Sequence, residues 1–332
     1  LKFGGTSVGS VEAIKRSANI ICDWSKKSKV IVVLSAMSGE TDRLINLTKS
    51  FSKSPNPVDF DNAISTGENL SCALMSIYLN NQKTKSKSLH SWQIPIMTSS
   101  EHMKSRILSI NKKFLLNELE NLDVLVVPGF QGINERREIT TLGRGGSDTS
   151  AVAVAAAMDA ECIIYTDVEG VFTTDPNIVP NAKKINKISY EEMLELASQG
   201  AKVLQTRSVE LAMRKNTKLS VRSSLKPKKI GTIITDEKSV LEKNTVSGIA
   251  YTKDEAKITL SRVLDKPGVS SKIFGPLSKG NINVDMILQN ISQDGKFANL
   301  SFTLPRADLE KALKILKKEK SKIGYKKIIS SN

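Results

Sequence analysis

Three glycine-containing segments, two of them glycine-rich, carry charged or hydroxyl side chains where a strand is expected to give way to a helix or a loop. The first, Lys2–Gly9, places a lysine just before two glycines. Glycines let backbone N–H groups approach an anion closely, and the N-terminus of a following helix attracts negative charge. The segment therefore favours phosphate binding, with Lys2 at the surface of the loop. A tight strand–helix turn is the structural alternative, and for this segment alone the two interpretations are equally good.

The second segment, Thr141–Thr149, again brings glycines and hydroxyls to the start of a helix. Its Arg144 sits in a glycine-rich turn with few partners for a structural ion pair, and a guanidinium can hold a carboxylate with two hydrogen bonds. Asp148 or Ser147 could instead cap the helix. The third segment, Thr166–Pro176, presents acidic side chains on a loop after a strand, which suits a nucleoside, its metal, or an ordinary Asx turn.

Short apolar runs alternate with helical patterns over the first two thirds of the chain. The runs Val30–Leu34, Val124–Val127 and Cys162–Thr166 predict buried strands, and residues 148–158 predict an Ala-rich helix. Such alternation predicts an α/β fold in which a mainly parallel sheet is sandwiched by helices. In such sheets, ligands bind at the carboxyl ends of the strands.

The pattern changes near Val221, and a Lys- and Pro-rich stretch predicts an exposed connection. Beyond it, the expected elements are strands at 256–260, 282–288 and 297–304 and helices at 268–277 and 308–318. This order is a small βαββα unit, which a last strand at 324–329 would complete as βαββαβ. The predicted domains are a catalytic domain at 1–224, a linker at 225–245 and a smaller domain at 246–332.

The composition narrows the class of protein. The chain has 332 residues, and no run of eighteen apolar residues is present, so a membrane protein is not expected. Three scattered cysteines and the lack of a signal peptide predict a cytoplasmic protein. The net charge of +15 favours a lysine-rich surface over nucleic-acid binding, because the lysines are spread along the chain and aromatic residues make up 5%.

Together these segments resemble the signature set of the aspartate kinases, within the amino acid kinase superfamily. Further stretches that carry this likeness, in order, are Ser35–Asp42, Ser65–Glu68, Gly129–Gly132 and Gly200–Leu204. The tail resembles an ACT domain at Leu264–Gly268 and Asn281–Asn290, and the family normally has two such modules. The resemblance therefore implies an incomplete regulatory domain, with a second ACT module missing. It also implies a true start a few residues before Leu1.

The resemblance implies a role for each matching residue. The ATP phosphates would be held by Lys2, Gly4, Gly5 and Thr6. The rest of the nucleotide would be held by Thr166, Asp167, Phe172, Asp175 and Lys202. The aspartate would be held by Ser35, Thr41, Glu68, Arg144 and Ser147. Within this set Glu68 would meet the substrate ammonium and Arg144 a carboxylate, while Asp148 would organise the reacting groups. Two positions depart from the family pattern: Phe172 stands where Tyr is usual, and Asn177 where Arg is common.

The ACT resemblance implies an amino-acid effector, lysine or threonine, and a homodimer or heterotetramer formed through this domain. The matching effector positions are Asp265, Ser270, Asn283, Val284, Asp285 and Gln289. A tail that serves only for dimerisation is the alternative.

The chemistry explains why these residue types are needed. A carboxylate acceptor is already ionised at neutral pH, so no strong general base is required, and the two histidines, His90 and His102, lie outside the motifs. The requirement is to align two anions and to screen their repulsion. We expect Lys2, helix N-termini and a Mg²⁺ ion carried by the nucleotide phosphates to do this, without a dedicated metal cage.

Two alternative functions fit parts of this sequence. A related kinase acting on glutamate, a carbamate or a nucleotide would share the glycine loops, but the tail and Ser65–Glu68 speak against it. An inactive amino-acid sensor that dimerises through its tail is disfavoured by the intact Lys2, Arg144 and Asp148.

Overall fold

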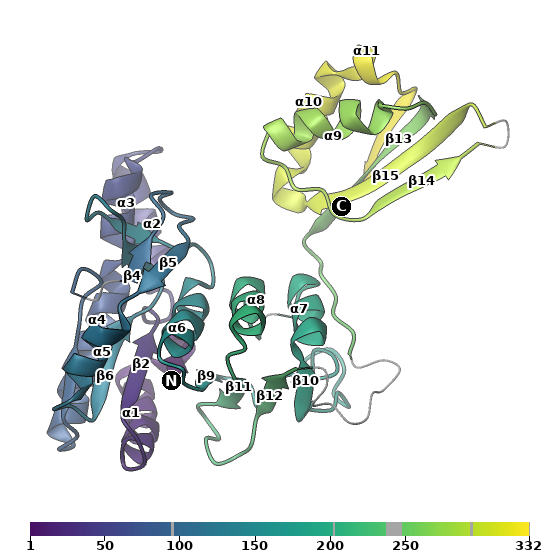
Figure 1. Ribbon diagram of the computed structural model, residues 1–332. Coiled ribbons are helices and arrows are strands. Elements are labelled where there is room, and N and C mark those ends of the chain that lie inside the picture. Colours follow the sequence, from purple (N-terminus) through teal and green to yellow (C-terminus); the bar gives the residue numbers. More distant parts are fainter. Residues whose placement is uncertain (94–95, 202, 237–247, 293–294, 332) are drawn as a thin grey trace. The chain divides into compact units, whose positions relative to one another are not determined.

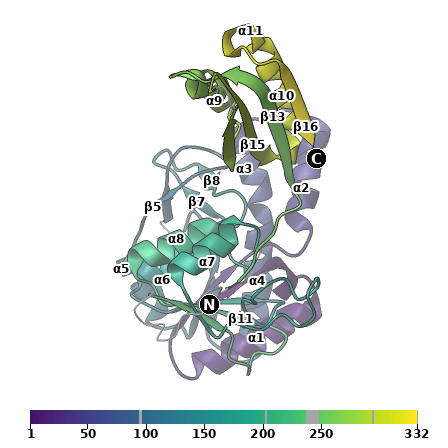
Figure 2. The ribbon, with the colours of Figure 1, turned by 90° about the vertical axis from the view of Figure 1, so that its right-hand side faces the viewer.

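The computed structural model describes residues 1–93, 96–201, 203–236, 248–292 and 295–331. The chain divides into two compact units, Leu1–Tyr251 and Thr252–Asn332 (Figures 1 and 2). In the described ranges, no helix combines the length and the apolar character needed to cross a membrane.

The first unit is built on a large sheet. Its strands are β1 (Lys2–Phe3), β2 (Val30–Leu34), β3 (Ser86–Ser88), β6 (Val124–Pro128), β9 (Cys162–Thr166), β10 (Lys187–Ser189), β11 (Leu219–Ser223) and β12 (Thr232–Thr235). They form an eight-stranded sheet in the order β10-β12-β11-β9-β1-β2-β6-β3. Neighbours from β11 to β3 pair in parallel, whereas β12 pairs antiparallel with β11 and parallel with β10. The predicted mainly parallel sheet is confirmed.

Helices cover both faces of this sheet (Figure 1). The helices of one face are α1 (Val11–Ser25) and α4 (Thr66–Asn81). Those of the other face are α5 (Lys112–Leu119), α6 (Gly146–Ala157), α7 (Tyr190–Ser198) and α8 (Thr206–Lys215). Successive residues of β2 show the division, because Val32 and Leu34 pack with α1 and α4, whereas Val33 packs with α5 to α8. A strand buried on both faces reads as a continuous apolar run, which is why β2 was predictable.

A smaller sheet and two further helices complete the unit. The sheet has the order β5-β4-β7-β8. Its strands are β4 (Ile96–Thr98), β5 (Ile107–Ile110), β7 (Gln131–Ile133) and β8 (Ile139–Thr141). The helices are α2 (Glu40–Phe51) and α3 (Pro57–Ile64), and a short 3-10 turn, η1 (Gly5–Ser7), follows β1. The sequence did not predict this sheet, because strands of three or four residues are too short to show a hydrophobic period.

Two boundaries in this unit differ from the sequence prediction. The Ala-rich helix begins at Gly146, two residues before the predicted start. The linker prediction for 225–245 is wrong for β12, whose Thr232 and Ile234 are fully buried between β11 and β10. The lysine- and proline-rich stretch before β12 indicated an exposed connection, so this four-residue strand was not predicted. Residues 237–245 of the predicted linker lie outside the described residues.

The second unit is a four-stranded antiparallel sheet with helices packed on one face. Its elements are β13 (Glu255–Leu264), α9 (Val269–Lys279), β14 (Ile287–Ile291), β15 (Phe297–Pro305), η3 (Arg306–Asp308), α10 (Leu309–Lys318), α11 (Lys320–Ile323) and β16 (Lys327–Ser331). The sheet order is β14-β15-β13-β16. Ile273, Phe302 and Leu316 meet in its core. The closing strand β16 confirms the βαββαβ prediction.

The strand predicted at 282–288 is misplaced, because β14 begins at Ile287. The apolar side chains before β14 pack against the core of the second unit. Ile282 is buried in the core beneath the helices, and Val284 packs against that core. Their alternation therefore reflects a loop that lies on the core. Only its last residues pair with β15, where the Asp285 N–H donates to Thr303 O and Met286 O accepts from the Thr303 N–H.

Candidate active site

The predicted site residues leave adjacent parallel strands at one edge of the large sheet. β9, β1, β2 and β6 lie side by side; the last residues of β1, β2 and β6 are in register, and β9 extends one residue further. Gly4, Ser35 and Gly129 each follow directly after one of these ends, and Thr166 is the last residue of β9. The Ser35 N–H donates to Phe3 O at 3.2 Å, which holds two of the loops together. Carboxyl ends of parallel strands are where open α/β sheets bind ligands.

An ion pair between Lys2 and Asp148 lies beside the first glycine loop. Lys2 Nζ is 2.6 Å from Asp148 Oδ1, and each side chain is 11% exposed. The Lys2 ammonium also lies against Gly4, because a Cβ at Gly4 would be 3.3 Å from Nζ. The predicted surface position of Lys2 is wrong: β1 includes Lys2, and its side chain reaches α6. The two glycine segments thus meet through this pair.

The second glycine segment begins α6 without a side-chain cap. The N-cap residue is Gly145 with φ +71°, a left-handed conformation that favours glycine. Neither Ser147 nor Asp148 caps the helix, so the capping alternative is wrong. A Cβ at Gly129 would lie 2.8 Å from Ser147 Cβ, so glycine there lets the loop after β6 pack tightly against α6.

Arg144 precedes this helix on the loop. Its side chain is exposed, and it forms no ion pair within the part of the chain that the structure describes. An unpaired guanidinium at the ligand edge of the sheet can take a carboxylate in bidentate fashion.

Glu68 is a buried acid with an unused oxygen. It lies in the first turn of α4 and is 3% exposed. Oε1 accepts a hydrogen bond from the Ala36 N–H at 3.1 Å, whereas Oε2 has no hydrogen-bond partner among the described residues. Burial raises the pKa of Glu68 to about 8, against the opposing effect of the Ala36 N–H. An arriving ammonium group would find both a free acceptor and an acid that it can ionise.

The same Ala36 joins Glu68 to the first glycine loop. A Cβ at Gly67 would lie 2.9 Å from Ala36 Cβ, and one at Gly5 would lie 3.0 Å from Ala36 O. Small residues therefore let α4, the loop after β2 and the loop after β1 pack without a gap. Thr41 lies half-buried in the first turn of α2, which follows that loop.

The loop after β9 contains two local hydrogen bonds to aspartate side chains. The Thr166 hydroxyl donates to Asp167 Oδ1 at 3.0 Å. Asp175 Oδ1 accepts from the Asn177 N–H at 2.9 Å, so Asp175 forms the Asx turn that was the alternative interpretation. Phe172 forms an isolated bridge with Lys184. Lys202 lies outside the described residues.

The predicted effector residues belong to the second unit. Gln289 Nε2 donates to Asp265 Oδ1 at 3.0 Å, so β14 and the end of β13 are linked at these positions. Ser270 lies in the first turn of α9. Asn283, Val284 and Asp285 lie on the connection that leads into β14.

Sequence reasoning missed three polar residues that support the site. Asp61 is fully buried on α3, His102 contacts it, and Arg207 on α8 donates to Leu142 O at 2.7 Å. Asp61 gave a signal, because an acid between Phe60 and Ile64 falls on the inward side of a short helix. Arg207 gave none, since its partners are backbone carbonyls distant in sequence.

Comparisons with known proteins agree with this arrangement. A profile of the amino acid kinase family matches residues 1–223, and a profile of the ACT domain matches residues 261–319. The aspartate kinase of Pseudomonas putida is 48% identical over 331 residues, which are 99% of this chain and 80% of that protein. The chain belongs to the amino acid kinase family, and within it to the aspartate kinases.

Solved structures of this family share the fold. The E. coli aspartokinase III in complex with aspartate and ADP has a TM-score of 0.78 and 24% identity, with 99% of this chain and 84% of that chain covered. The same enzyme in complex with lysine and aspartate has a TM-score of 0.77 and 25% identity at the same coverage.

The buried ion pair predicts a specific loss of stability. Lys2→Met should lower the free energy of unfolding by about 3 kcal/mol, because Asp148 would stay buried without its cation. Lys26→Met is the matched control, since the pair between Lys26 and Asp23 is exposed and should matter little. Urea unfolding at pH 7 measures both. The double variant with Asp148→Asn should regain most of the lost stability and stay inactive. A Lys2→Met variant as stable as the wild type would contradict this role of the pair.

Glu68 predicts a pH dependence of stability. Because its pKa is raised from 4.5 to about 8, the folded chain keeps a proton that the unfolded chain loses between these values. Stability should therefore fall as pH rises through this window, by at most about 1.4 kcal/mol per pH unit from this group. Glu68→Gln should remove that decline, so its advantage over the wild type grows from pH 5 to pH 8 in urea unfolding. Glu12→Gln, at an acid whose pKa is lowered, is the control; an equal response in both variants would argue against a protonated Glu68.

Proposed function

We propose that the protein transfers the γ-phosphoryl group of ATP to the side-chain carboxylate of L-aspartate and so forms 4-phospho-L-aspartate. The observation that carries the proposal is the placement of Lys2, paired with Asp148, where the loops after β1, β2 and β6 converge. In-line transfer between two anions is limited by their alignment and their repulsion, and a fixed cation between glycine loops acts on both.

Each charged group has a distinct part in this proposal. Gly4, Gly5 and Thr6 receive the phosphates, and the Lys2 ammonium, held by Asp148, faces the oxygens that gain charge during transfer. Arg144 holds a carboxylate of aspartate, and Glu68 accepts its ammonium, with Ser35, Thr41 and Ser147 as hydroxyl partners. Asp148 keeps Lys2 in place before the nucleotide arrives. The residues Thr166, Asp167, Phe172, Asp175 and Lys202 hold the remainder of the nucleotide.

We expect a Mg²⁺ ion at this site to be bound mainly by the nucleotide phosphates and not by a dedicated set of protein ligands. Among the described residues, no group of three or more His, Cys, Asp or Glu is arranged to hold a metal, and Asp148 is already paired with Lys2. Phosphate oxygens are then the main ligands, as Mg²⁺ commonly prefers in kinases. Bound there, the ion neutralises charge on the phosphates, and the protein residues orient the two substrates.

The wider role follows from the reaction and from the ACT domain. We place the reaction at the first step of lysine, threonine and methionine biosynthesis, in the cytoplasm, where the three free cysteines would stay reduced. Feedback by lysine or threonine would act through the second unit, whose Asp265 and Gln289 are linked. The E. coli relative in complex with lysine supports this class of effector. Assembly through the ACT domain, as a homodimer or heterotetramer, belongs to the same proposal.

The direct test is a coupled assay of ADP release with aspartate, glutamate or acetylglutamate as the acceptor. We expect release with aspartate alone, because Glu68 and Arg144 would match its ammonium and carboxylate. Trapping of the acyl phosphate with hydroxylamine identifies the product. Release that depends on another acceptor and not on aspartate would reject the proposal.

Arg144→Ala should raise the KM for aspartate more than the KM for ATP. A charged hydrogen-bonded pair is worth about 1.5–3 kcal/mol, so the KM for aspartate should increase by roughly ten-fold or more. Steady-state kinetics with each substrate varied in turn measures the two values. Arg136→Ala is a suitable control, because Arg136 lies on the turn between β7 and β8, outside the predicted site. Equal increases for both substrates would place Arg144 elsewhere.

A further inference from the structure

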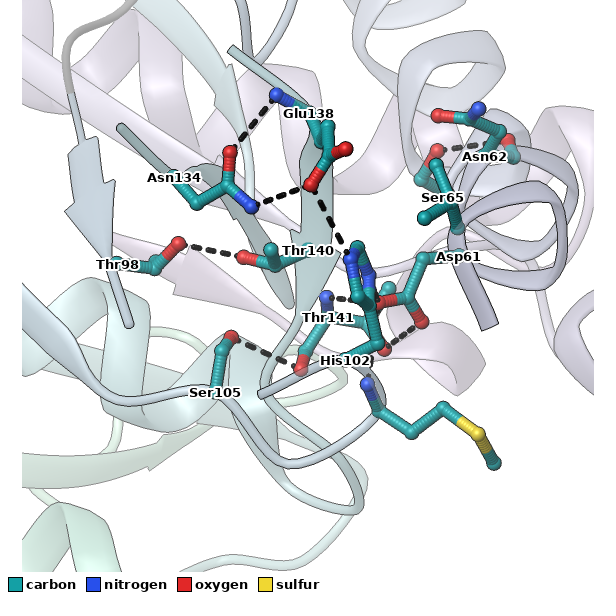
Figure 3. Close-up of polar contacts among 12 residues, drawn as sticks. Asp61, Asn62, Ser65, Thr98, His102, Ser105, Asn134, Glu138, Thr140 and Thr141 are labelled. Atoms are coloured by element: carbon teal, nitrogen blue, oxygen red, sulfur yellow. Dashed lines mark hydrogen bonds and ion pairs between the residues drawn. The ribbon is translucent and has the colours of Figure 1, made fainter. Parts of the chain in front are cut away.

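We propose that Asp61, assisted by His102, is a positioning residue for the substrate: it fixes the loop that carries Arg144 relative to the helix that carries Glu68. The inference rests on the function proposed above, and it adds residues that touch neither substrate. It concerns the network of polar side chains between α3 and β8 (Figure 3).

Asp61 is the centre of this network. Its side chain is fully buried, and the carboxylate accepts four hydrogen bonds from two separate segments. Oδ2 accepts from His102 Nδ1 at 2.8 Å and from the Met103 N–H at 3.0 Å. The Thr141 N–H donates to the same oxygen at 3.0 Å, and the Thr141 hydroxyl donates to Oδ1 at 2.7 Å. A buried carboxylate with this many donors holds each of them in one geometry.

The partners of Asp61 lie next to the two ends of the substrate site. Asp61 is on α3, which leads through Ser65 directly into α4 and Glu68. Thr141 is the last residue of β8, three residues before Arg144. Gln131 on β7, which pairs with Thr141 of β8, adds a second link to the start of α4, because its Nε2 donates to Ser65 O at 3.0 Å. The separation between the proposed ammonium and carboxylate sites is therefore set by these bonds.

The turn at His102 and Met103 packs against Gly143, which lies on the loop that carries Arg144. Met103 has φ +66°, an uncommon conformation for a residue with a side chain, and its N–H is held by Asp61. The Met103 carbonyl oxygen would be 3.0 Å from a Cβ at Gly143, so the turn and the loop are in close contact. His102 Nε2 lies 3.5 Å from Glu138 Oε2, and Asn134 Nδ2 donates to the same oxygen at 2.7 Å. His102 thus links Asp61 to the β7–β8 turn.

The carbonyl oxygens of Thr141 and Leu142 are held by Ser105 and by Arg207 on α8. Thr141 O accepts from the Ser105 N–H at 3.0 Å and from Ser105 Oγ at 2.9 Å. Arg207 donates to both Leu142 O and Ser105 O. These bonds hold the loop in place, but none of them reaches α3 or α4. The hydrogen bonds to Asp61 are the ones that couple the Arg144 loop to the helix that carries Glu68.

Thr141→Val tests the coupling with little risk to the fold. The substitution removes one hydroxyl and keeps the volume and the Thr141 N–H bond, whereas Asp61→Ala would leave several buried donors without an acceptor. We expect the KM for aspartate to rise roughly ten-fold, with the KM for ATP unchanged, because a loosened loop misplaces Arg144 only. Thr141→Ser, which retains the hydroxyl, should restore the wild-type KM.

Thr140→Val is the matched control. Thr140 is the preceding residue, is equally buried, and gives up a comparable bond, to Thr98 Oγ1 at 2.5 Å, which lies away from Asp61 (Figure 3). It should lower stability without changing the KM for aspartate. Equal KM values for aspartate in the two valine variants would overturn the positioning role while the wild type stays active. A wild-type chain without aspartate-dependent ADP release would instead overturn the proposed function, and this inference with it.

Discussion

Two anions must be brought together in this site, and their mutual repulsion is the constraint on which its architecture depends. The sheet meets the constraint by geometry, since adjacent parallel strands end in register and deliver their loops to one edge. The buried pair of Lys2 and Asp148 then keeps a cation at that edge before any ligand binds. Burial strengthens the field of that cation, because little water is present to screen it. Glycines in the surrounding loops leave room for backbone N–H groups to take part.

The acids of the site are arranged so that they do not oppose this field. Asp148 is neutralised by Lys2, and burial keeps a proton on Glu68 near neutral pH. The Lys2–Asp148 pair is neutral as a whole, and the exposed guanidinium of Arg144 adds a positive charge on the loop before α6. Glu68 would ionise only when an ammonium group arrives, which couples its charge to the presence of the amino acid. Until the substrate ammonium binds, a proton and not a cationic side chain neutralises Glu68.

Local sequence patterns predicted the main strands of the large sheet better than the buried contacts around the candidate site. Val30–Leu34 and Cys162–Thr166 were identified as strands because a continuous apolar run of this length has few alternatives between glycine turns. Lys2 was predicted to bind phosphate from the surface of its loop, and its burial was missed, since a two-residue strand has no period to reveal it. The short strand β12 was missed because the stretch before it indicated an exposed connection, and β14 was misplaced because the apolar alternation before it belongs to a loop on the core. The contacts of Arg207 join residues far apart in sequence, which no local pattern encodes, and the partners of Asp61 are equally distant although its inward position on α3 gave a local signal.

The central claim is that one cation, held by Asp148 between two glycine loops, receives the phosphates while Arg144 and Glu68 hold the acceptor. A crystal structure of the chain with ADP, Mg²⁺ and aspartate tests it most directly. The account predicts phosphate oxygens within hydrogen-bonding distance of Lys2 Nζ and of the Gly4–Gly5 backbone. It also predicts an aspartate carboxylate on Arg144 and the ammonium on Glu68. Nucleotide phosphates bound away from Lys2, with its ion pair to Asp148 unchanged, would contradict it.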